Sequence, residues 1–381
     1  MERVHEVAFR TPAPTFPGKE DELFLKLESL QRLGAFKIRG AWNRMSQLPE
    51  EERRRGVATI SSGNHGLAVA WSARRLGLRC VVHVPTGAAG PKVEAIRAQG
   101  AELIEMPRED LVRAHTDELW RSWPQTFIHP FAHPHVIAGQ GTIGWELAED
   151  LPGVRTVLVP VGGGGLSSGI AIAVKARIPE AKVFGVQAAG AATLPIVFQT
   201  KAAYRVEDPQ TIADGIRIGI ILPAMAELLL RNLDGCLIVS DAEIEEAMRR
   251  LAFEAKIMAE PAGAAAFAAW MGHRQELEPP VAVIVSGGNV DPALLARTLQ
   301  PAAPPVPRPG AAGPPGRSAT LDRMTRALEM AKQARDRGMD VKETRKALKQ
   351  ARAAFEAGDY PTAMHLADRI IEQCREPTKS H

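Results

Sequence analysis

The chain has 381 residues, 45% of them hydrophobic, which is enough to bury a sizeable core and to form two or three domains. Its 47 basic and 44 acidic residues nearly cancel, and the segment from Ser318 onward holds 13 of the basic and 10 of the acidic ones. The residues before Ser318 are therefore neutral overall. Composition and charge together exclude an intrinsically disordered protein and give no signal for nucleic-acid binding.

The N-terminal segment and the cysteines narrow the choices further. The segment MERVHEVAFRTP carries charges where a secretory signal peptide has an apolar run, and no stretch approaches the ~20 apolar residues of a membrane span. Cys80, Cys236 and Cys374 lie far apart, without the paired spacing of a zinc site or a disulfide framework. We therefore expect a cytoplasmic protein with reduced thiols, no membrane partner and no nucleic-acid partner.

Short segments rich in Val and Ile alternate with amphipathic segments along the first 300 residues. The strand-like segments are 57–60, 80–85, 156–161, 182–187 and 281–288, and the helix-like ones include 67–77, 92–100 and 167–178. This alternation predicts an α/β protein whose sheet is mostly parallel.

The segment LGAFKIRGA, residues 33–41, places Lys37 after a glycine and an aromatic residue and before an arginine. A lysine in such a stretch is usually only a surface charge. A lysine can also hold an aldehyde cofactor as an imine. Lys37 therefore becomes a candidate for that role if a phosphate site that is not a nucleotide site occurs elsewhere in the chain.

The segment SSGNHG, residues 61–66, lies between the strand-like segment 57–60 and the helix-like segment 67–77. Small polar residues before a helix often only cap it. The same helix start also offers serine hydroxyls, Asn64 and free backbone amides. Such a group of donors suits a substrate carboxylate.

Four consecutive glycines, Gly162–Gly165, follow the strand-like segment 156–161 and precede the helix-like segment 167–178. Residues without side chains let backbone N–H groups converge on an anion, and the helix start adds its positive end. A tight turn is the alternative explanation, although a turn seldom needs four glycines. No GKS, GKT or GxGxxG motif accompanies the run, so it predicts a phosphate site of another kind. Together with Lys37, it predicts an aldehyde cofactor that carries a phosphate.

The segment VSGGNVD, residues 285–291, is another strand end followed by glycines. Ser286 could donate one hydrogen bond to a ring, or accept one from it. By itself this is a weak signal.

The composition changes near residue 300. Residues 301–317 are almost entirely Pro, Gly and Ala and cannot form a core, which predicts an extended linker. Residues 320–375 contain three helix-like segments, divided at Gly338 and Gly358, and no strand-like run. We expect a small helical bundle or hairpin there, somewhat similar to tetratricopeptide units, that serves assembly, contact with a protein partner or only solubility.

These four motifs, in this order, resemble the β-family of pyridoxal-phosphate enzymes (fold-type II), specifically threonine or serine dehydratases and serine racemases. Other stretches that match the family are residues 26–45, 91–103, 136–142 and 211–216. The resemblance covers about residues 5–300 and leaves the C-terminal segment outside it.

The resemblance implies an α/β fold of the tryptophan synthase β type, with two α/β domains, the cofactor between them, and a small all-α C-terminal appendage. Residues 1–40 and 137–300 would form the large cofactor-binding domain, and residues 41–136 the small domain. Residues 301–319 would form the linker and residues 320–376 the appendage.

The resemblance also implies pyridoxal 5′-phosphate as the cofactor and a role for each motif. Lys37 would hold the cofactor and act as general base, and Phe36 would pack beside its ring. Asn64 would hydrogen-bond the phenolic oxygen, and Ser286 would face the pyridine nitrogen. The phosphate would be bound by Gly162, Gly163, Gly164 and Gly165. The substrate carboxylate would be bound by Ser61, Ser62, Gly63, Asn64 and His65.

Three features limit this transfer of roles from the family. Ala35 stands where the family usually has Ser before the Phe-Lys pair. At the cation site of many members, Gln187 replaces an acidic ligand and Thr193 occupies the later position, so we expect no metal. Ser62 matches the second, opposite-face base of serine racemases, but the same serine occurs in dehydratases.

We therefore expect a pyridoxal-phosphate dependent lyase that converts L-threonine, L-serine or a related 3-hydroxy amino acid into a 2-oxo acid and ammonia. An amino-acid racemase is the alternative, since Lys37 and Ser62 could pass a proton across the α-carbon. A synthase fits the motifs less well. A non-catalytic binding protein with this fold is a different class, and intact Lys37, Asn64 and Ser286 argue against it. We also expect a homo-oligomer, either a dimer or a tetramer.

Overall fold

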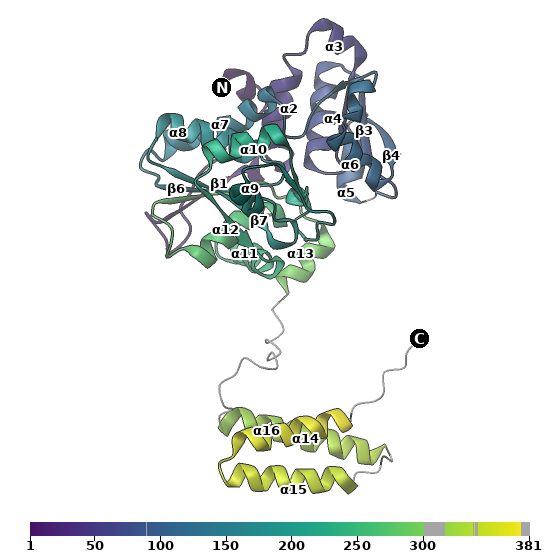
Figure 1. The fold of residues 1–381 in the computed structure, drawn as a ribbon, viewed down its shortest axis with the longest axis vertical. Helices are drawn as coiled ribbons and strands as arrows, with labels where there is room; N and C mark the ends of the chain where they lie inside the picture. Colours follow the sequence, from purple (N-terminus) through teal and green to yellow (C-terminus); the bar gives the residue numbers. More distant parts are fainter. Residues whose placement is uncertain (89, 301–316, 338, 340–341, 375–381) are drawn as a thin grey trace. The chain divides into compact units, whose positions relative to one another are not determined.

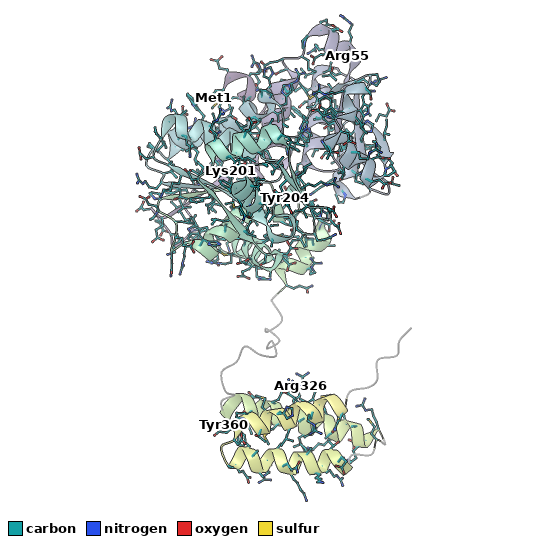
Figure 2. The ribbon with its side chains drawn as sticks, in the orientation of Figure 1. Met1, Arg55, Lys201, Tyr204, Arg326 and Tyr360 are labelled. Atoms are coloured by element: carbon teal, nitrogen blue, oxygen red, sulfur yellow. The ribbon has the colours of Figure 1, made fainter. Side chains whose placement is uncertain are left out.

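The computed structural model describes residues 1–88, 90–300, 317–337, 339 and 342–374 (Figure 1, with side chains in Figure 2). The chain divides into two compact units, Met1–Gln300, here called the body, and Pro301–His381. Residues 301–316 of the expected linker lie outside the described residues.

The body contains a five-stranded parallel sheet in the order β1-β11-β6-β7-β10. Its strands are β1 (Leu23–Leu27), β6 (Thr156–Pro160), β7 (Lys182–Ala188), β10 (Gly235–Val239) and β11 (Val281–Val285). Successive side chains of a strand point to opposite faces, so Val281, Val283 and Val285 pack in one apolar core and Ala282 and Ile284 in another. Every residue of β6 and β11 is buried, as in a parallel sheet that helices cover on both faces.

Two groups of helices cover this sheet (Figure 1). Helices α11 (Asp241–Phe253) and α12 (Pro261–His273) pack on one face, and α7 (Pro134–Asp150), α8 (Gly165–Arg177) and α10 (Pro223–Asn232) on the other. Small residues bring these helices close to their neighbours. For example, a Cβ atom on Gly144 of α7 would lie 2.6 Å from the carbonyl oxygen of Ile170 in α8.

A second parallel sheet, in the order β4-β3-β2-β5, is formed by residues between 57 and 127. Its strands are β2 (Val57–Ile60), β3 (Cys80–Pro85), β4 (Glu102–Met106) and β5 (Thr126–Phe127). Helices α2 (Lys37–Met45), α4 (Asn64–Leu76) and α5 (Pro91–Arg97) share its apolar core. The predicted α/β architecture with mostly parallel sheet is thus confirmed.

The remaining elements of the body are short. An antiparallel pair is formed by β8 (Tyr204–Arg205) and β9 (Ile220–Ile221). The other α-helices are α1 (Glu2–His5), α3 (Glu50–Arg55), α6 (Arg108–Thr116), α9 (Leu194–Thr200) and α13 (Pro292–Leu299). The 3₁₀ helices are η1 (Glu28–Leu30), η2 (Arg32–Gly34), η3 (Leu119–Ser122), η4 (Ala189–Ala191) and η5 (Asp214–Ile216).

The described part of the second unit is all α-helical. It consists of α14 (Arg317–Asp336), α15 (Lys342–Glu356) and α16 (Tyr360–Gln373). Ala327, Ala331 and Ala334 pack in one core with Ile370 and Ile371, because alanines let neighbouring helices approach closely. The predicted helical appendage is confirmed, but α14 begins at Arg317, so residues 317–319 belong to a helix and not to the expected linker. Within the described residues, we find no helix that combines the length and the apolar character needed to cross a membrane.

Candidate active site

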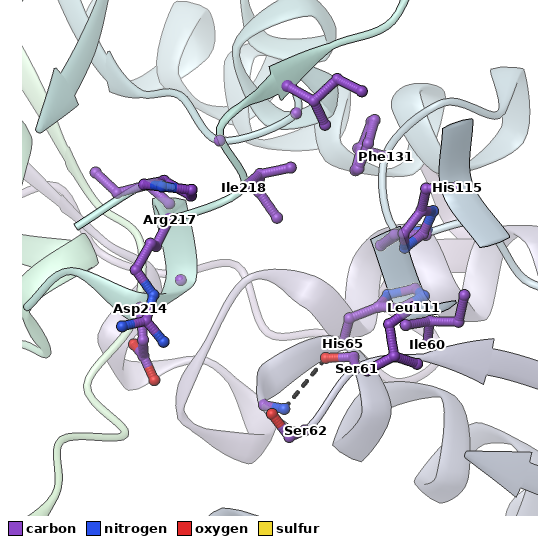
Figure 3. A pocket seen from close by; sticks show the side chains of 18 of the residues that line it. Ile60, Ser61, Ser62, His65, Leu111, His115, Phe131, Asp214, Arg217 and Ile218 are labelled. Atoms are coloured by element: carbon purple, nitrogen blue, oxygen red, sulfur yellow. Dashed lines mark hydrogen bonds between the residues drawn. The ribbon is translucent and has the colours of Figure 1, made fainter. Parts of the chain in front are cut away.

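One cavity in the body, of about 890 Å³, is lined by every residue that the sequence predicted for cofactor and substrate binding. Figure 3 shows this cavity and labels Ser61, Ser62 and His65 of the predicted residues. These residues follow the carboxyl ends of β2, β6 and β11 or begin α2. In parallel α/β sheets, loops at the carboxyl ends of strands form the ligand sites. The predicted residues that line the cavity are Phe36, Lys37, Ser61, Ser62, Gly63, Asn64, His65, Gly162, Gly163, Gly164, Gly165 and Ser286.

Lys37 is the first residue of α2. Its Nζ donates a hydrogen bond to the carbonyl oxygen of Pro130 (2.9 Å) and lies 5.1 Å from the centre of the Phe36 ring. Burial disfavours the charged amine and lowers the pKa of Lys37 to about 8, while the negative charge of Glu260 opposes this shift. A sizeable fraction of the amine is then neutral near pH 8, and the neutral form is the one that attacks a carbonyl group or accepts a proton.

The four glycines form the turn between β6 and α8. Gly164 has a φ of +92°, which side chains rarely adopt. A Cβ atom would lie 2.4 Å from the Phe131 ring on Gly163, and 2.7 Å from the Phe131 carbonyl oxygen on Gly165. The turn therefore has no room for side chains. Because it lines the cavity and begins a 13-residue helix, its backbone N–H groups are suited to bind a phosphate.

The two serines after β2 lie at the cavity, between Asp214 on one side and Leu111 on the other (Figure 3). Ser61 Oγ accepts a hydrogen bond from the backbone N–H of Gly63 (3.1 Å), which shapes the turn into α4. Ser62 follows directly. This turn brings two hydroxyls and the first amides of a helix to one cavity, an arrangement suited to a carboxylate.

His65 lines the same cavity but is only 3% exposed. Its Nε2 lies 3.0 Å from the carbonyl oxygen of Ile128. Burial, together with the positive charge of Lys37, lowers the pKa of His65 to about 3. The ring is therefore neutral and adds no positive charge to a carboxylate site.

Asn64 is held by side chains that the sequence analysis did not single out. Its Nδ2 donates to Oε1 of Glu260 (2.6 Å), and its Oδ1 accepts from Nδ2 of Asn289 (2.8 Å). Nζ of Lys92 lies 3.4 Å from Oε2 of Glu260 and 2.8 Å from Oδ2 of Asp214. Glu260 is 2% exposed, and burial raises its pKa to about 7 although Lys92 lowers it.

Little in the sequence pointed to these partners. Lys92 and Asp214 lie within stretches that match the family, and Asn289 lies within VSGGNVD, but none of them carried a motif of its own. Glu260 stands 196 residues from Asn64 and directly before the alanine-rich helix α12. Only the packing of the fold brings Glu260 to the cavity.

Ser286 follows β11 and is 4% exposed. Its backbone carbonyl accepts a hydrogen bond from the N–H of Phe36 (3.2 Å), which places it beside the start of α2. Its Oγ lies 3.4 Å from the carbonyl oxygen of Ala262, at the long end of the range for a hydrogen bond. A hydroxyl with so weak a partner can exchange it for a ligand atom.

The side-chain amide of Gln187 forms hydrogen bonds with the loop that leads into α9. Its Oε1 accepts from the backbone N–H groups of Thr193 (2.8 Å) and Leu194 (2.7 Å), and its Nε2 donates to Oγ1 of Thr193 (2.9 Å). The amide thus ties the end of β7 to the start of α9. Among the described residues, no group of three or more His, Cys, Asp or Glu side chains is placed to bind a metal.

The residues of the cavity fit pyridoxal phosphate. The lowered pKa of Lys37 suits an amine that reacts with an aldehyde. The glycine turn, which a Cβ atom on Gly163 would fill, suits a phosphate. The weakly bonded hydroxyl of Ser286 suits a ring nitrogen.

Comparison with known proteins supports this fit. Residues 8–287 match the family described as "Pyridoxal-phosphate dependent enzyme". The chain is 41% identical over 297 residues to the L-threonine ammonia-lyase of Thermotoga maritima, which covers 78% of this chain and 74% of that protein. It is 37% identical over 296 residues to the serine racemase of Schizosaccharomyces pombe, covering 76% and 92%.

A solved structure gives the same result for the fold. The processed form of threonine deaminase isoform 2 from Solanum lycopersicum is 31% identical, with a TM-score of 0.72, over 77% of this chain and 84% of that one. The matches cover the body, which contains the cavity and all of its predicted residues. The chain therefore belongs to the family of pyridoxal-phosphate dependent enzymes.

Proposed function

We propose that this protein removes water and ammonia from L-threonine, L-serine or a related 3-hydroxy amino acid and produces a 2-oxo acid. The observation that carries the proposal is Lys37, an amine with a lowered pKa in the same cavity as a phosphate-type glycine turn and a carboxylate-type loop. The relatives from Thermotoga maritima and Solanum lycopersicum, named for threonine ammonia-lyase and threonine deaminase, support the same reaction.

The residues of the cavity divide the work of this reaction. When bound, pyridoxal phosphate supplies an electron-withdrawing ring conjugated to the α-carbon. The hydroxyls and backbone N–H groups of residues 61–65 bind the substrate carboxylate. The neutral Nζ of Lys37 takes the α-proton as general base. The β-hydroxyl leaves with a proton as water, and hydrolysis of the released product yields the 2-oxo acid and ammonia.

Ser286 would favour elimination over reactions in which negative charge must persist at the α-carbon. Its neutral hydroxyl, unlike a carboxylate, does not keep a ring nitrogen protonated. Negative charge at the α-carbon is then only weakly stabilised, so prompt loss of the β-hydroxyl is favoured.

A substrate panel tests the proposal. The purified protein with pyridoxal phosphate is incubated with L-threonine, L-serine and other 3-hydroxy amino acids, and both 2-oxo acid and the D-enantiomer are measured. We expect 2-oxo acid from at least one of them. If no member of the panel yields 2-oxo acid, the proposed reaction is wrong.

Racemisation is the second candidate, supported by Ser62 at the cavity and by the serine racemase of Schizosaccharomyces pombe. Elimination needs one base, Lys37, whereas racemisation needs a second group on the opposite face to return the proton. In a dehydratase, Ser62→Ala should keep a substantial part of the 2-oxo acid production. In a racemase, D-serine formation should collapse while elimination survives better. Equal loss of both would mean that Ser62 mainly shapes the carboxylate loop.

We further propose that the protein is a cytoplasmic homo-oligomer, a dimer or a tetramer, and that its helical appendage contacts a protein partner. Size-exclusion chromatography of the full chain tests the oligomeric state.

Within the body, residues 1–40 and 137–300 would form the large domain and residues 41–136 the small one, in keeping with the two separate sheets. A chain that ends at residue 305 tests the boundary between the body and the C-terminal unit. The shorter chain should still fold and bind cofactor, and failure to fold would contradict the boundary.

A further inference from the structure

A directional chain of hydrogen bonds sets the orientation of the Asn64 side chain. Nδ2 of Asn289 donates to the carbonyl oxygen of Leu33 (2.7 Å) and to Oδ1 of Asn64 (2.8 Å). A backbone carbonyl oxygen can only accept, so it is the nitrogen of the Asn289 amide that faces Leu33 and Asn64. The oxygen of Asn64 therefore faces Asn289, and its nitrogen faces the other way.

Glu260 takes up the other end of the Asn64 amide. Nδ2 of Asn64 donates to Oε1 of Glu260 at 2.6 Å. A flipped Asn64 would set its nitrogen against that of Asn289, which is repulsive, and its oxygen against the ionised carboxylate of Glu260, which is repulsive as well. Nδ2 carries two hydrogens, and Glu260 accepts one of them. The other has no acceptor among the described residues, and Asn64 lines the cavity.

Lys92 joins this carboxylate to the second sheet. Lys92 lies on α5, which shares the core of the four-stranded sheet, whereas Glu260 precedes α12, which packs on the five-stranded sheet. The Glu260 side chain is 3% exposed and the Lys92 side chain 25%. A carboxylate so deeply buried needs a compensating cation. Among the described residues, Lys92 is the cation in direct contact with Glu260, and Lys92 also pairs with Asp214. Lys37 interacts with Glu260 electrostatically, without an ion pair.

We propose that Glu260 is a positioning residue that holds Asn64 so that one N–H of its amide points at the phenolic oxygen of the cofactor, with Lys92 keeping Glu260 in place. The inference rests on the proposed function only for the presence of the cofactor. It goes beyond that function because it gives roles to Glu260, Lys92 and Asn289, to which the motifs assigned none. Glu260 acts here through Asn64, whose amide nitrogen it binds.

The variant Glu260→Gln tests this role, because glutamine keeps the shape of the side chain and removes its charge. In the full-length protein we expect the dissociation constant of pyridoxal phosphate to rise about tenfold, the size of effect of a hydrogen bond to a charged group. The visible absorption of the bound cofactor should shift as well. Glu94→Gln is the matched control, since it removes a carboxylate of α5 that pairs with Arg97 at the surface and does not line the cavity. Its effect on cofactor affinity should stay within about twofold.

A double-mutant cycle separates positioning from a direct effect of the carboxylate on the ring. If Glu260 acts through Asn64, then Glu260→Gln should change affinity by less than about twofold once Asn64 is already alanine. Full additivity of the two changes would overturn the proposal. The same spectral shift in both backgrounds would show that Glu260 acts on the ring directly, which also contradicts it.

Lys92 variants supply the last arm of the test. Lys92→Arg keeps the charge and should hold cofactor affinity within about threefold of wild type, whereas Lys92→Met should match the loss of Glu260→Gln. Equal cofactor affinity in Lys92→Arg and Lys92→Met would overturn the role proposed for Lys92. None of these measurements uses a substrate, so a wrong substrate assignment leaves them intact. Failure of the wild-type protein to bind pyridoxal phosphate would instead overturn the proposed function.

Discussion

Two basic side chains two residues apart on α2 respond to burial in opposite ways. The guanidinium of Arg39 donates to both oxygens of Glu28 (2.7 and 2.8 Å) and also pairs with Glu146. Burial alone would lower the pKa of Arg39, but these two carboxylates outweigh it and hold the pKa above its ordinary value. Lys37 has no carboxylate within ion-pair distance among the described residues, and its pKa falls to about 8. Burial makes a basic group reactive only where no counter-charge accompanies it.

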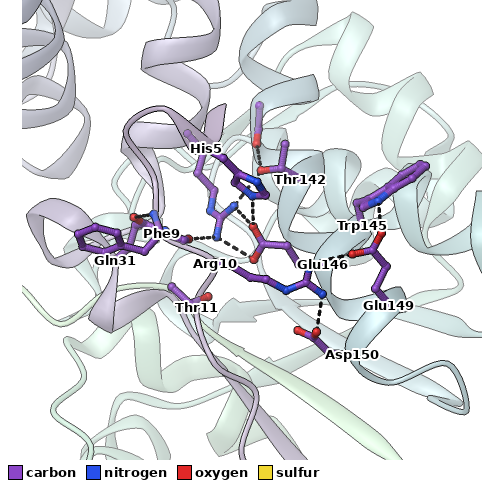
Figure 4. Close-up of polar contacts among 12 residues, drawn as sticks. His5, Phe9, Arg10, Thr11, Gln31, Thr142, Trp145, Glu146, Glu149 and Asp150 are labelled. Atoms are coloured by element: carbon purple, nitrogen blue, oxygen red, sulfur yellow. Dashed lines mark hydrogen bonds and ion pairs between the residues drawn. The ribbon is translucent and has the colours of Figure 1, made fainter. Parts of the chain in front are cut away.

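The partners of Arg39 also explain why Lys37 is held in place. Figure 4 shows one of these partners, Glu146, and its contact with His5. Glu146 of α7 accepts from Arg39 of α2, from Lys26 of β1 (2.8 Å) and from His5 (2.9 Å). Two cations, Arg39 and Lys26, and two anions, Glu28 and Glu146, are thus buried together, and all four side chains are inaccessible to solvent. This paired cluster fixes α2 against α7, and with it the start of the helix that carries the reactive lysine.

Replacing the unpaired lysine should have the largest effect on function. In Lys37→Ala the visible absorption of the bound cofactor should disappear, and elimination should fall by at least ~10³-fold because the general base is lost. The stability of the cofactor-free protein should not fall, since a poorly compensated charge is removed. Absorption spectra, 2-oxo acid assays and urea unfolding measure the three effects. An unchanged visible band in the variant would show that another group holds the cofactor.

Replacing the paired arginine should lower the stability of the protein, whereas replacing Lys37 should not. Arg39→Met leaves Glu28 and Glu146 buried without their main partner, and we expect the free energy of unfolding to fall by about 3–5 kcal/mol. Urea unfolding monitored by circular dichroism measures it. Arg10→Ala is the control, because Arg10 pairs with Glu149 at the surface and should change stability by no more than ~1 kcal/mol. Equal effects of the two changes would mean that the buried cluster contributes no more than a surface pair.

The two positions should also differ in how stability depends on pH. The pKa of Lys37 is about 8 in the folded protein and near 10.5 when unfolded, so between these values the unfolded chain binds the extra proton. Wild-type stability should therefore rise, relative to Lys37→Met, by on the order of 3 kcal/mol from pH 8 to pH 10.5.

The corresponding difference between wild type and Arg39→Met should stay flat over this range, because the guanidinium remains charged. Unfolding of the cofactor-free proteins at several pH values measures both trends. If the difference in stability between wild type and Lys37→Met does not change with pH, the charge of Lys37 is compensated in the folded state.

The smallest expected effect concerns the anion that the site is built to receive. Gly164→Val adds a side chain at a φ of +92° and against Leu229, so cofactor affinity should fall about tenfold or more. Gly18→Ala is the control, since Gly18 also has a positive φ (+73°) but has open space around it and lies outside the cavity. The control should lower stability slightly and leave cofactor affinity unchanged. Wild-type affinity in Gly164→Val would place the phosphate elsewhere.

Much of the architecture could be predicted from local patterns. The segments 57–60 and 80–85 are strands as expected, and the strand within the expected segment 281–288 covers residues 281–285. A buried parallel strand is typically a short run of β-branched residues, which a local pattern can reveal. The helices of the appendage could also be predicted from the sequence. The exception is residues 317–319, an arginine, a serine and an alanine after the Pro- and Gly-rich stretch, where α14 already begins.

The order of the elements and the motif residues that line the cavity follow from the sequence, since glycine runs, helix starts and strand ends are properties of neighbouring residues. The tertiary structure alone decided that Arg39 is paired and Lys37 is not, that His65 is neutral, and that Glu260 holds Asn64. Each of these depends on groups far away in the chain, brought together by the packing of helices on two sheets. Charge state and hydrogen-bond direction are set by those neighbours in space, and no local pattern records them.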